Sequence, residues 1–223
     1  MTTLQKLLLL ITIIYMTVLI SAVTLVHKLI IIDGFVTSAA VLVFPISFVL
    51  SDIIAEIYGY EVARLIVWLG LLGQLIFAIF SYVIIQIPSP NNWHQQDAFS
   101  LILGSLPHIY LAGIIATLIS SFANIYIISK WKILMNGKHF WLRSIGSSGI
   151  GEAIYTVICG LIIFLGQIPI SELFTIILSI YVIKLIYAIL LAGPANFLTT
   201  WMKGMSDKDI LDIGINYNPF KLV

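Results

Sequence analysis

The stretch 35-FVTSAAVLVFPISFVLSDIIAEI-57 combines the length of a membrane span with two acidic residues, Asp52 and Glu56. A helix needs about 20 mostly apolar residues to cross the hydrocarbon of a bilayer. A carboxylate placed in that hydrocarbon costs at least ~2.5 kcal/mol, so such groups face the interior of a helix bundle and find partners there. The stretch therefore predicts a transmembrane helix whose acidic face is buried in protein.

The rest of the chain has the same apolar character. Of its 223 residues 61% are hydrophobic and 9% are charged, with a mean hydropathy of +1.11, whereas an average soluble domain has about 25% charged residues. We expect an all-α integral membrane protein with one domain over residues 1–223. Six stretches are long enough to span a bilayer: 7–26, 35–57, 65–87, 106–129, 145–168 and 172–200.

The basic residues predict the orientation of these spans. If the N-terminus lies inside, Lys28 alone falls on the outer side, and Lys184 lies within a span. The other nine fall on the inner side: Lys6, Arg64, Lys130, Lys132, Lys138, Arg143, Lys203, Lys208 and Lys221. Because Lys and Arg concentrate in cytoplasmic loops, we expect a plasma-membrane protein with both termini in the cytoplasm. These residues are spread over separate loops, which argues against a nucleic-acid partner.

Three spans place ionisable residues at a similar depth. With a rise of 1.5 Å per residue, Glu152 and Lys184 each lie roughly 10 Å from the inner boundary, and Asp52 lies at a comparable level. Mutual neutralisation is the least costly arrangement, so we expect a buried polar cluster. Two simpler readings stay open. Glu152 and Lys184 could form a purely structural ion pair, and Glu56 could pair with Arg64 across the turn that follows its span.

Two local features of the second span add to this picture. Phe48 lies four residues before Asp52, so both share one helical face with Glu56. Pro45 lies about two turns before Asp52, where its missing N–H predicts a kink in the span.

The glycine-rich stretch 145–152 does not predict a nucleotide site. A basic loop precedes it and a membrane-length helix follows, whereas a dinucleotide-binding turn needs a strand before it and a βαβ unit around it. Its small residues instead indicate close helix packing or backbone exposed to a ligand. The sequence has no hydrolase or zinc motif and a single cysteine, Cys159, so we predict no enzyme, cofactor or metal site.

The segment from Phe44 to Tyr60, followed by Ala63-Arg64, resembles the signature of the queuosine precursor transporters, also called the vitamin uptake transporter family. Members of that family also have six spans, an acid in the fifth and a lysine in the sixth followed by a proline, as Lys184 and Pro194 stand here. The fifth-span acid is usually aspartate followed by threonine, whereas this chain has Glu152-Ala153. The resemblance covers nearly the whole length.

The resemblance implies import of a small planar base: the cyano or aminomethyl deazaguanine precursor of queuosine, or queuine. It also implies a fold similar to the substrate-binding subunits of energy-coupling-factor transporters, and a second possibility is that the chain is itself the capture subunit of a multi-component importer. A carboxylate can accept two adjacent N–H donors of a guanine-like edge. We expect Asp52, Glu152 and Lys184 to bind the base and Phe48, Tyr155 or Tyr187 to stack on it, with Trp68 a further aromatic candidate, while Glu56 and Arg64 form a gate or a structural ion pair. A homodimer or a coupling partner is possible, and its identity is left open.

Overall fold

Six long helices form the body of the protein, for which a computed structural model describes residues 1–32, 34–104, 106–164, 169–205 and 209–221. They are α1 (Thr3–Leu25), α2 (Phe44–Tyr58), α3 (Tyr60–Ile85), α5 (Leu106–Leu134), α6 (Phe140–Phe164) and α7 (Ile170–Lys203). The shorter elements are the strands β1 (Leu29–Ile32) and β2 (Phe35–Ser38), the 3-10 helix η1 (Ala39–Leu42) and the helix α4 (Gln96–Leu103). Among the described residues, six helical segments are long and apolar enough to cross a membrane, which confirms the predicted fold class.

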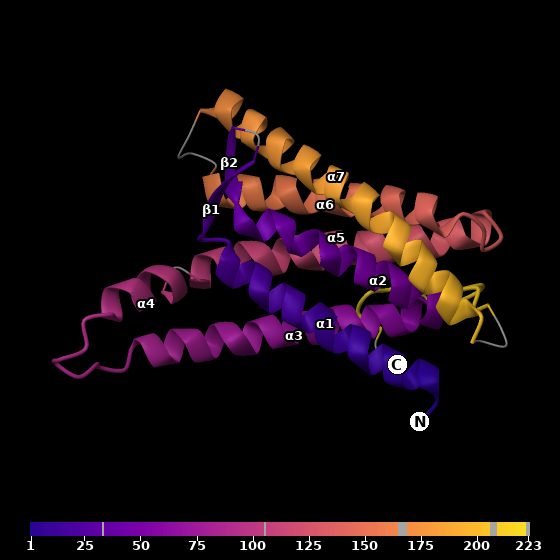
Figure 1. Cartoon of the computed structure of the whole chain (residues 1–223), viewed down its shortest axis with the longest axis horizontal. Helices are drawn as coiled ribbons and strands as arrows, with labels where there is room; N and C mark the ends of the chain where they lie inside the picture. Colours follow the sequence, from indigo (N-terminus) through magenta and orange to yellow (C-terminus); the bar gives the residue numbers. More distant parts are fainter. Residues whose placement is uncertain (33, 105, 165–168, 206–208, 222–223) are drawn as a thin grey trace.

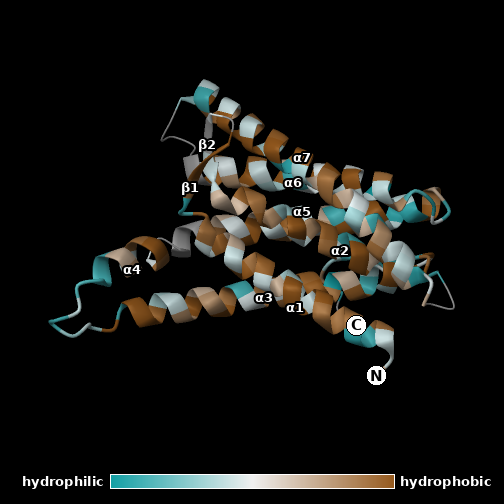
Figure 2. Cartoon of the chain, viewed as in Figure 1, coloured by the Kyte–Doolittle hydropathy of each residue, from teal (hydrophilic) through white to brown (hydrophobic). Residues whose placement is uncertain are grey.

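The two ends of the helix bundle are distinct (Figure 1). Both chain termini lie at one end, called here the terminal end, and the β1–β2 hairpin and α4 lie at the opposite, hairpin end. The hairpin is antiparallel and pairs Leu29 with Ser38 and Ile32 with Phe35. Hydrophobic residues follow the length of α3, and hydrophilic residues gather in the loop between α3 and α4 (Figure 2). This distribution suits a bundle whose sides contact lipid and whose ends contact water.

Helix α2 is the centre of the bundle. In the span Ala39–Tyr58, which is made of η1 and α2, 78% of the apolar stretch is buried inside the protein, against 17% for α7. Helix α2 packs against α1, α3, α5, α6 and α7. The side chains of Asp52 and Glu56 are therefore enclosed by protein, as the cost of exposing a carboxylate to lipid requires.

The second span begins later than predicted. Residues 35–38 form β2, the second strand of the hairpin, and α2 starts at Phe44. Pro45 therefore lies in the first turn of α2, where its missing N–H breaks no helical hydrogen bond, so the predicted kink is wrong. The connection between the predicted spans 65–87 and 106–129 contains α4. Residues 165–168, the predicted end of the fifth span, lie outside the described residues.

The glycine-rich stretch brings α6 close to its neighbours. A Cβ atom at Gly151 would lie 2.6 Å from the Phe48 ring on α2, and one at Gly146 would overlap the Trp131 ring on α5. Small residues at both positions allow the helix backbones to approach closely, as the sequence indicated. This approach places the polar residues of α6 against α2.

Candidate functional site

A cavity of about 620 Å³ opens in the half of the bundle nearest the hairpin end, within the usual range for small-molecule sites. The hairpin, η1 and all six long helices contribute to its wall. On α7 its lining runs from Ile176 to Lys184, so Lys184 marks its inner end, near the middle of the bundle. Most of the lining is apolar, with these polar side chains among it: Thr37, Ser38, Gln74, Thr117, Thr156 and Lys184.

The inner end of the cavity combines a buried ion pair with two aromatic rings. The Lys184 ammonium lies 2.9 Å from Oε2 of Glu152, 4.4 Å from the centre of the Tyr155 ring and 4.9 Å from that of Phe44. The two rings lie 4.0 Å apart at 32° to each other. The ammonium is thus held by one carboxylate and by two aromatic faces, an arrangement that partly offsets its removal from water.

Three buried oxygens in or beside the cavity have no hydrogen-bond partner among the described residues. They are Oε1 of Glu152 and the hydroxyls of Thr37 and Thr156, and both threonines line the cavity. Nearly all buried polar atoms in proteins are hydrogen-bonded, so unpartnered oxygens beside a cavity indicate groups that a bound molecule can satisfy. Gln74 adds a carboxamide to the same wall and makes one long bond, 3.4 Å, to the Leu19 carbonyl.

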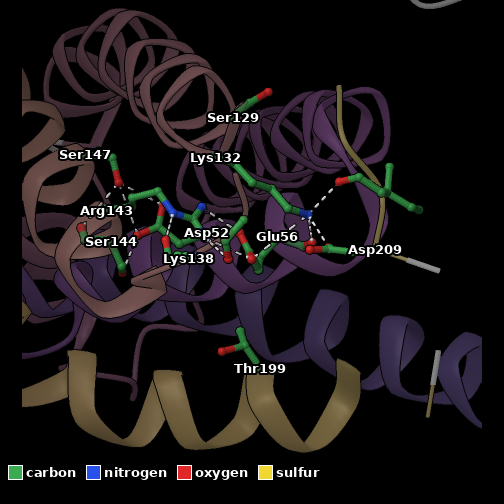
Figure 3. A network of polar contacts seen from close by, with 12 residues as sticks. Asp52, Glu56, Ser129, Lys132, Lys138, Arg143, Ser144, Ser147, Thr199 and Asp209 are labelled. Atoms are coloured by element: carbon green, nitrogen blue, oxygen red, sulfur yellow. Dashed lines mark hydrogen bonds and ion pairs between the residues drawn. The ribbon is translucent and has the colours of Figure 1, made fainter. Parts of the chain in front are cut away.

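Asp52 does not line this cavity. Its carboxylate lies one layer further toward the terminal end and is enclosed by donors from α5 and α6 (Figure 3). The Asn124 amide donates to Oδ1 at 2.7 Å, and the hydroxyls of Ser144 and Ser148 donate to Oδ2 at 2.6 and 2.9 Å. Ser147 contributes a longer contact of 3.4 Å.

Glu56, one turn further along α2, is the centre of an ion cluster (Figure 3). Arg143 donates to both of its oxygens, at 2.7 and 3.0 Å, and the Lys203 ammonium lies 2.5 Å from Oε1. Lys132 lies 4.0 Å from the same oxygen. Lys132 and Lys203 also contact Asp209, at 2.8 and 3.0 Å, so the cluster joins the four helices α2, α5, α6 and α7 to the C-terminal segment.

Asp209 belongs to this cluster although it lies beyond the last span. Partial burial raises the pKa of its carboxyl, but hydrogen bonds from Lys132 and Lys203 outweigh that effect and lower the pKa below its ordinary value. The carboxylate form is therefore the one that the folded protein favours.

The C-terminal segment docks on α3 and α5 at the terminal end. Asp212 accepts a hydrogen bond from the backbone N–H of Tyr60 at 3.1 Å and one from the Ser129 hydroxyl at 2.5 Å. Gly59, between α2 and α3, has a φ of +85°, and a Cβ there would lie 2.9 Å from the Asp212 carboxylate. A glycine at this turn thus permits both the backbone conformation and the contact with the segment.

The predicted ion pair between Glu56 and Arg64 is wrong. Arg64 donates instead to the carbonyls of Asn216 and Asn218, each at 3.0 Å. Glu56 forms its ion pairs with cations of α5, α6 and α7. Trp68, a predicted stacking candidate, donates to the Pro219 carbonyl at 2.8 Å and is part of the same docking surface. Arg64 and Trp68, both on α3, therefore bind the C-terminal segment.

The other predicted site residues divide into two groups. Lys184 and Tyr155 line the cavity, and Glu152 contacts Lys184 directly. Phe48 is buried against Phe44 and the glycine face of α6, and neither it nor Asp52 or Tyr187 is part of the cavity lining. Sequence reasoning missed these residues of the cavity, the Asp52 network and the ion cluster: Phe44, Thr37, Gln74, Thr156, Asn124, Lys132, Arg143 and Lys203. Gln74 and Asn124 carried a usable signal, because both are amides within apolar spans.

The family model described as "Putative vitamin uptake transporter" matches residues 38–198, which include the cavity wall from Ser38 onward and all of α2, α3, α5 and α6. The chain belongs to this family. The match includes Lys184 and Glu152 at the inner end of the cavity, and Glu56, Lys132 and Arg143 of the ion cluster.

A relative from Bacillus subtilis (strain 168), named "Probable queuosine precursor transporter", is 29% identical over 138 residues. The matched region covers 61% of this chain and 60% of the relative. No solved structure matches the chain, so the similarity to energy-coupling-factor subunits stays a prediction.

Proposed function

We propose that this protein imports a queuosine precursor, a planar deazaguanine base, and binds it in the cavity near Lys184. The main support is the unpartnered Oε1 of Glu152, a buried acceptor beside a cation and two rings. The name of the Bacillus subtilis relative supports the same substrate class.

The proposed contacts follow from the chemistry of such a base. Its guanine-like edge offers adjacent N–H donors, which Oε1 of Glu152 and the Thr156 hydroxyl can accept. Lys184 donates to the carbonyl oxygen on the same edge while remaining paired with Glu152. The base stacks on the ring of Tyr155 or Phe44, both of which reach the inner end of the cavity. The low dielectric of the bundle interior strengthens each of these hydrogen bonds.

The distribution of basic residues supports an orientation in which the cavity faces outward. Nine of the eleven Lys and Arg residues belong to the terminal end by the predicted topology, which puts that end in the cytoplasm and the hairpin end outside. The cavity then lies in the outer half of a plasma-membrane protein, and the ion cluster and docked C-terminal segment close its cytoplasmic side. A substrate enters past the hairpin and leaves when that closure opens.

The test is uptake of labelled precursor by cells that cannot synthesise it. Glu152→Gln and Lys184→Ala each remove one partner of a buried charge pair, so we expect uptake to fall at least about tenfold. Matched controls are Glu172→Gln and Lys138→Ala, which change exposed residues of the same types and should transport normally. Supplying the cyano base, the aminomethyl base and queuine one at a time identifies the substrate.

Normal uptake by both Glu152→Gln and Lys184→Ala, at equal expression, would overturn the proposed binding site. Uptake by the purified protein in vesicles distinguishes a standalone importer, which works alone, from a capture subunit, which binds the base but does not move it.

A further inference from the structure

Among the residues that the structure describes, Asp52 has no cation partner, unlike the other two buried acids of the spans, Glu56 and Glu152. Each of those two carboxylates forms an ion pair, with Arg143 and Lys184 respectively. Within the described part of the chain the hydrogen bonds to Asp52 come only from neutral groups, although its side chain is fully buried. A membrane-embedded carboxylate without a fixed cation is costly and marks an ion or proton pathway.

The groups around Asp52 suit a change of its charge. Ser144, Ser147 and Ser148 present hydroxyls, each of which can donate or accept a hydrogen bond. If the carboxyl gains a proton on Oδ2, the new O–H donates to a serine that had been a donor, and that serine turns its own hydrogen elsewhere. A lysine or arginine in this place could not make the exchange, because neither side chain can accept.

Asn124 provides the acceptor that such an exchange needs. Its amide nitrogen bonds Asp52 and Ser51, while its carboxamide oxygen is buried and has no partner among the described residues. Protonation of Asp52 adds one donor to the network, and the Asn124 oxygen is one acceptor in excess. The network therefore contains an acceptor for the donor that protonation adds, which the Glu56 and Glu152 ion pairs do not offer.

A bound proton fits the distances better than a bound metal ion. The donors contact the carboxylate oxygens directly at 2.6 to 2.9 Å, which are hydrogen-bond lengths, and the cavity does not extend to Asp52. A metal ion would need the same oxygens to surround a common centre.

The charged groups around Asp52 each have another partner. Glu56 on α2, Arg143 on α6, Lys132 on α5 and Lys203 on α7 belong to the ion cluster on one side, and Glu152 and Lys184 form the pair on the other. From α1 and α3, Tyr15 bonds Ser121 and Arg64 bonds carbonyls of the C-terminal segment. Asp52 thus lies between the cavity and the cytoplasmic closure without being neutralised by either.

We propose that Asp52 is the proton-coupling site of this transporter. The proton binds Oδ2 of the carboxylate from the outer side and converts it to a neutral carboxyl, and it leaves to the cytoplasm when the closure opens, which restores the carboxylate. This proposal rests on the proposed import function. It assigns to the chain an energy source, the inward proton gradient, and moves Asp52 from the substrate contacts to the coupling step.

The test uses the purified full chain in vesicles with labelled precursor and the membrane voltage clamped at zero. An inward gradient of one pH unit should drive the wild type to about a tenfold accumulation if one proton accompanies each substrate. Asp52→Asn should still exchange labelled for unlabelled precursor at equal concentrations, but should not accumulate it. Asp52→Glu should restore part of the accumulation, and Glu172→Gln, an exposed acid, should behave as the wild type.

The outcomes of this test distinguish a failure of the proton-coupling proposal from a failure of the proposed import function. If the wild type does not exchange precursor at all, the import function fails. If it exchanges but a proton gradient gives no accumulation, or a sodium gradient does so instead, proton coupling fails and the function stands. Accumulation by Asp52→Asn equal to that of the wild type would remove Asp52 from the coupling step.

A measurement on the unaltered protein covers the case in which Asp52→Asn does not fold. Dicyclohexylcarbodiimide reacts with protonated carboxyls in apolar surroundings, and mass spectrometry locates the adduct. Asp52 should be labelled, increasingly as the pH falls, while Glu56 and Glu152, whose carboxylates are bound by Arg143 and Lys184, should not be labelled. Labelling of those two without Asp52, or no labelling at any of the three, would overturn the proposal.

Discussion

Arg143 binds Glu56 through two parallel hydrogen bonds, 2.7 and 3.0 Å long, and both side chains are fully buried. The cluster around this pair contains three cations, Arg143, Lys132 and Lys203, and two acids, Glu56 and Asp209. Removing Glu56 therefore leaves an excess of two positive charges, whereas removing Arg143 leaves the cluster neutral.

This imbalance predicts that Glu56→Gln is more destabilising than Arg143→Gln. Removing one partner of a buried ion pair, so that the other charge is left uncompensated, lowers the free energy of unfolding by about 3 to 5 kcal/mol. The measurement is thermal unfolding of the purified protein in detergent, where Glu56→Gln should lower the midpoint more. Lys138→Ala, at an exposed position of the loop between α5 and α6, should leave the midpoint unchanged. Equal unfolding midpoints for Glu56→Gln and Arg143→Gln would contradict the prediction that excess positive charge in the cluster decides its stability.

The ion cluster shows where sequence reasoning reached its limit. The pairing of Glu152 with Lys184 was predictable, because depth within a span follows from residue number and opposite charges at one depth attract. Arg143, Lys132 and Lys203 gave no such signal. They lie at the ends of spans, where basic residues also serve topology, and the sequence does not say which of them turn inward.

The docking of the C-terminal segment could not be predicted from the sequence for a different reason. Its contacts with α3 run largely through backbone carbonyls, such as those bonded by Arg64 and Trp68, and any sequence provides carbonyls. Part of the cavity wall could not be predicted either. Thr37 belongs to a hairpin strand whose residues have the apolar character of the start of a membrane span.

Close packing of α6 against α2 gives a second prediction. Gly151→Ala places a methyl group 2.6 Å from the Phe48 ring, so a neighbour must move, and overpacking of this kind costs about 1 to 3 kcal/mol. The unfolding midpoint should fall. Gly193→Ala on α7 is the matched control, because a Cβ there meets no atom within 4 Å, and its midpoint should be equal to or above that of the wild type. A neutral Gly151→Ala would show that the helices separate easily at this contact.

Docking of the C-terminal segment should weaken in acid. The pKa of Asp209 is lower in the folded protein than its ordinary value, so its contribution to docking is fully present above the ordinary pKa of about 3.9. That contribution is lost as the pH falls through the lowered value. Hydrogen exchange in residues 209–221 should therefore increase, relative to the spans, between pH 5 and pH 3. Asp209→Asn should show fast exchange in this segment at both pH 5 and pH 3. If Asp209→Asn kept the pH dependence of the wild type, Asp209 would be excluded as the group that causes it.

Thr156 offers a prediction in which stability and binding change in opposite directions. Its hydroxyl is buried without a partner beside the cavity, so Thr156→Val removes an unsatisfied polar group at nearly constant volume. The unliganded protein should gain about 1 kcal/mol in stability. If the hydroxyl accepts an N–H of the precursor, the same change should weaken binding about tenfold, because the substrate donor is then left unpaired. Thr175→Val, at an exposed site where the hydroxyl bonds the carbonyl of Ser171, should alter neither quantity appreciably. A Thr156→Val protein that binds the precursor as tightly as the wild type would show that the base lies elsewhere in the cavity.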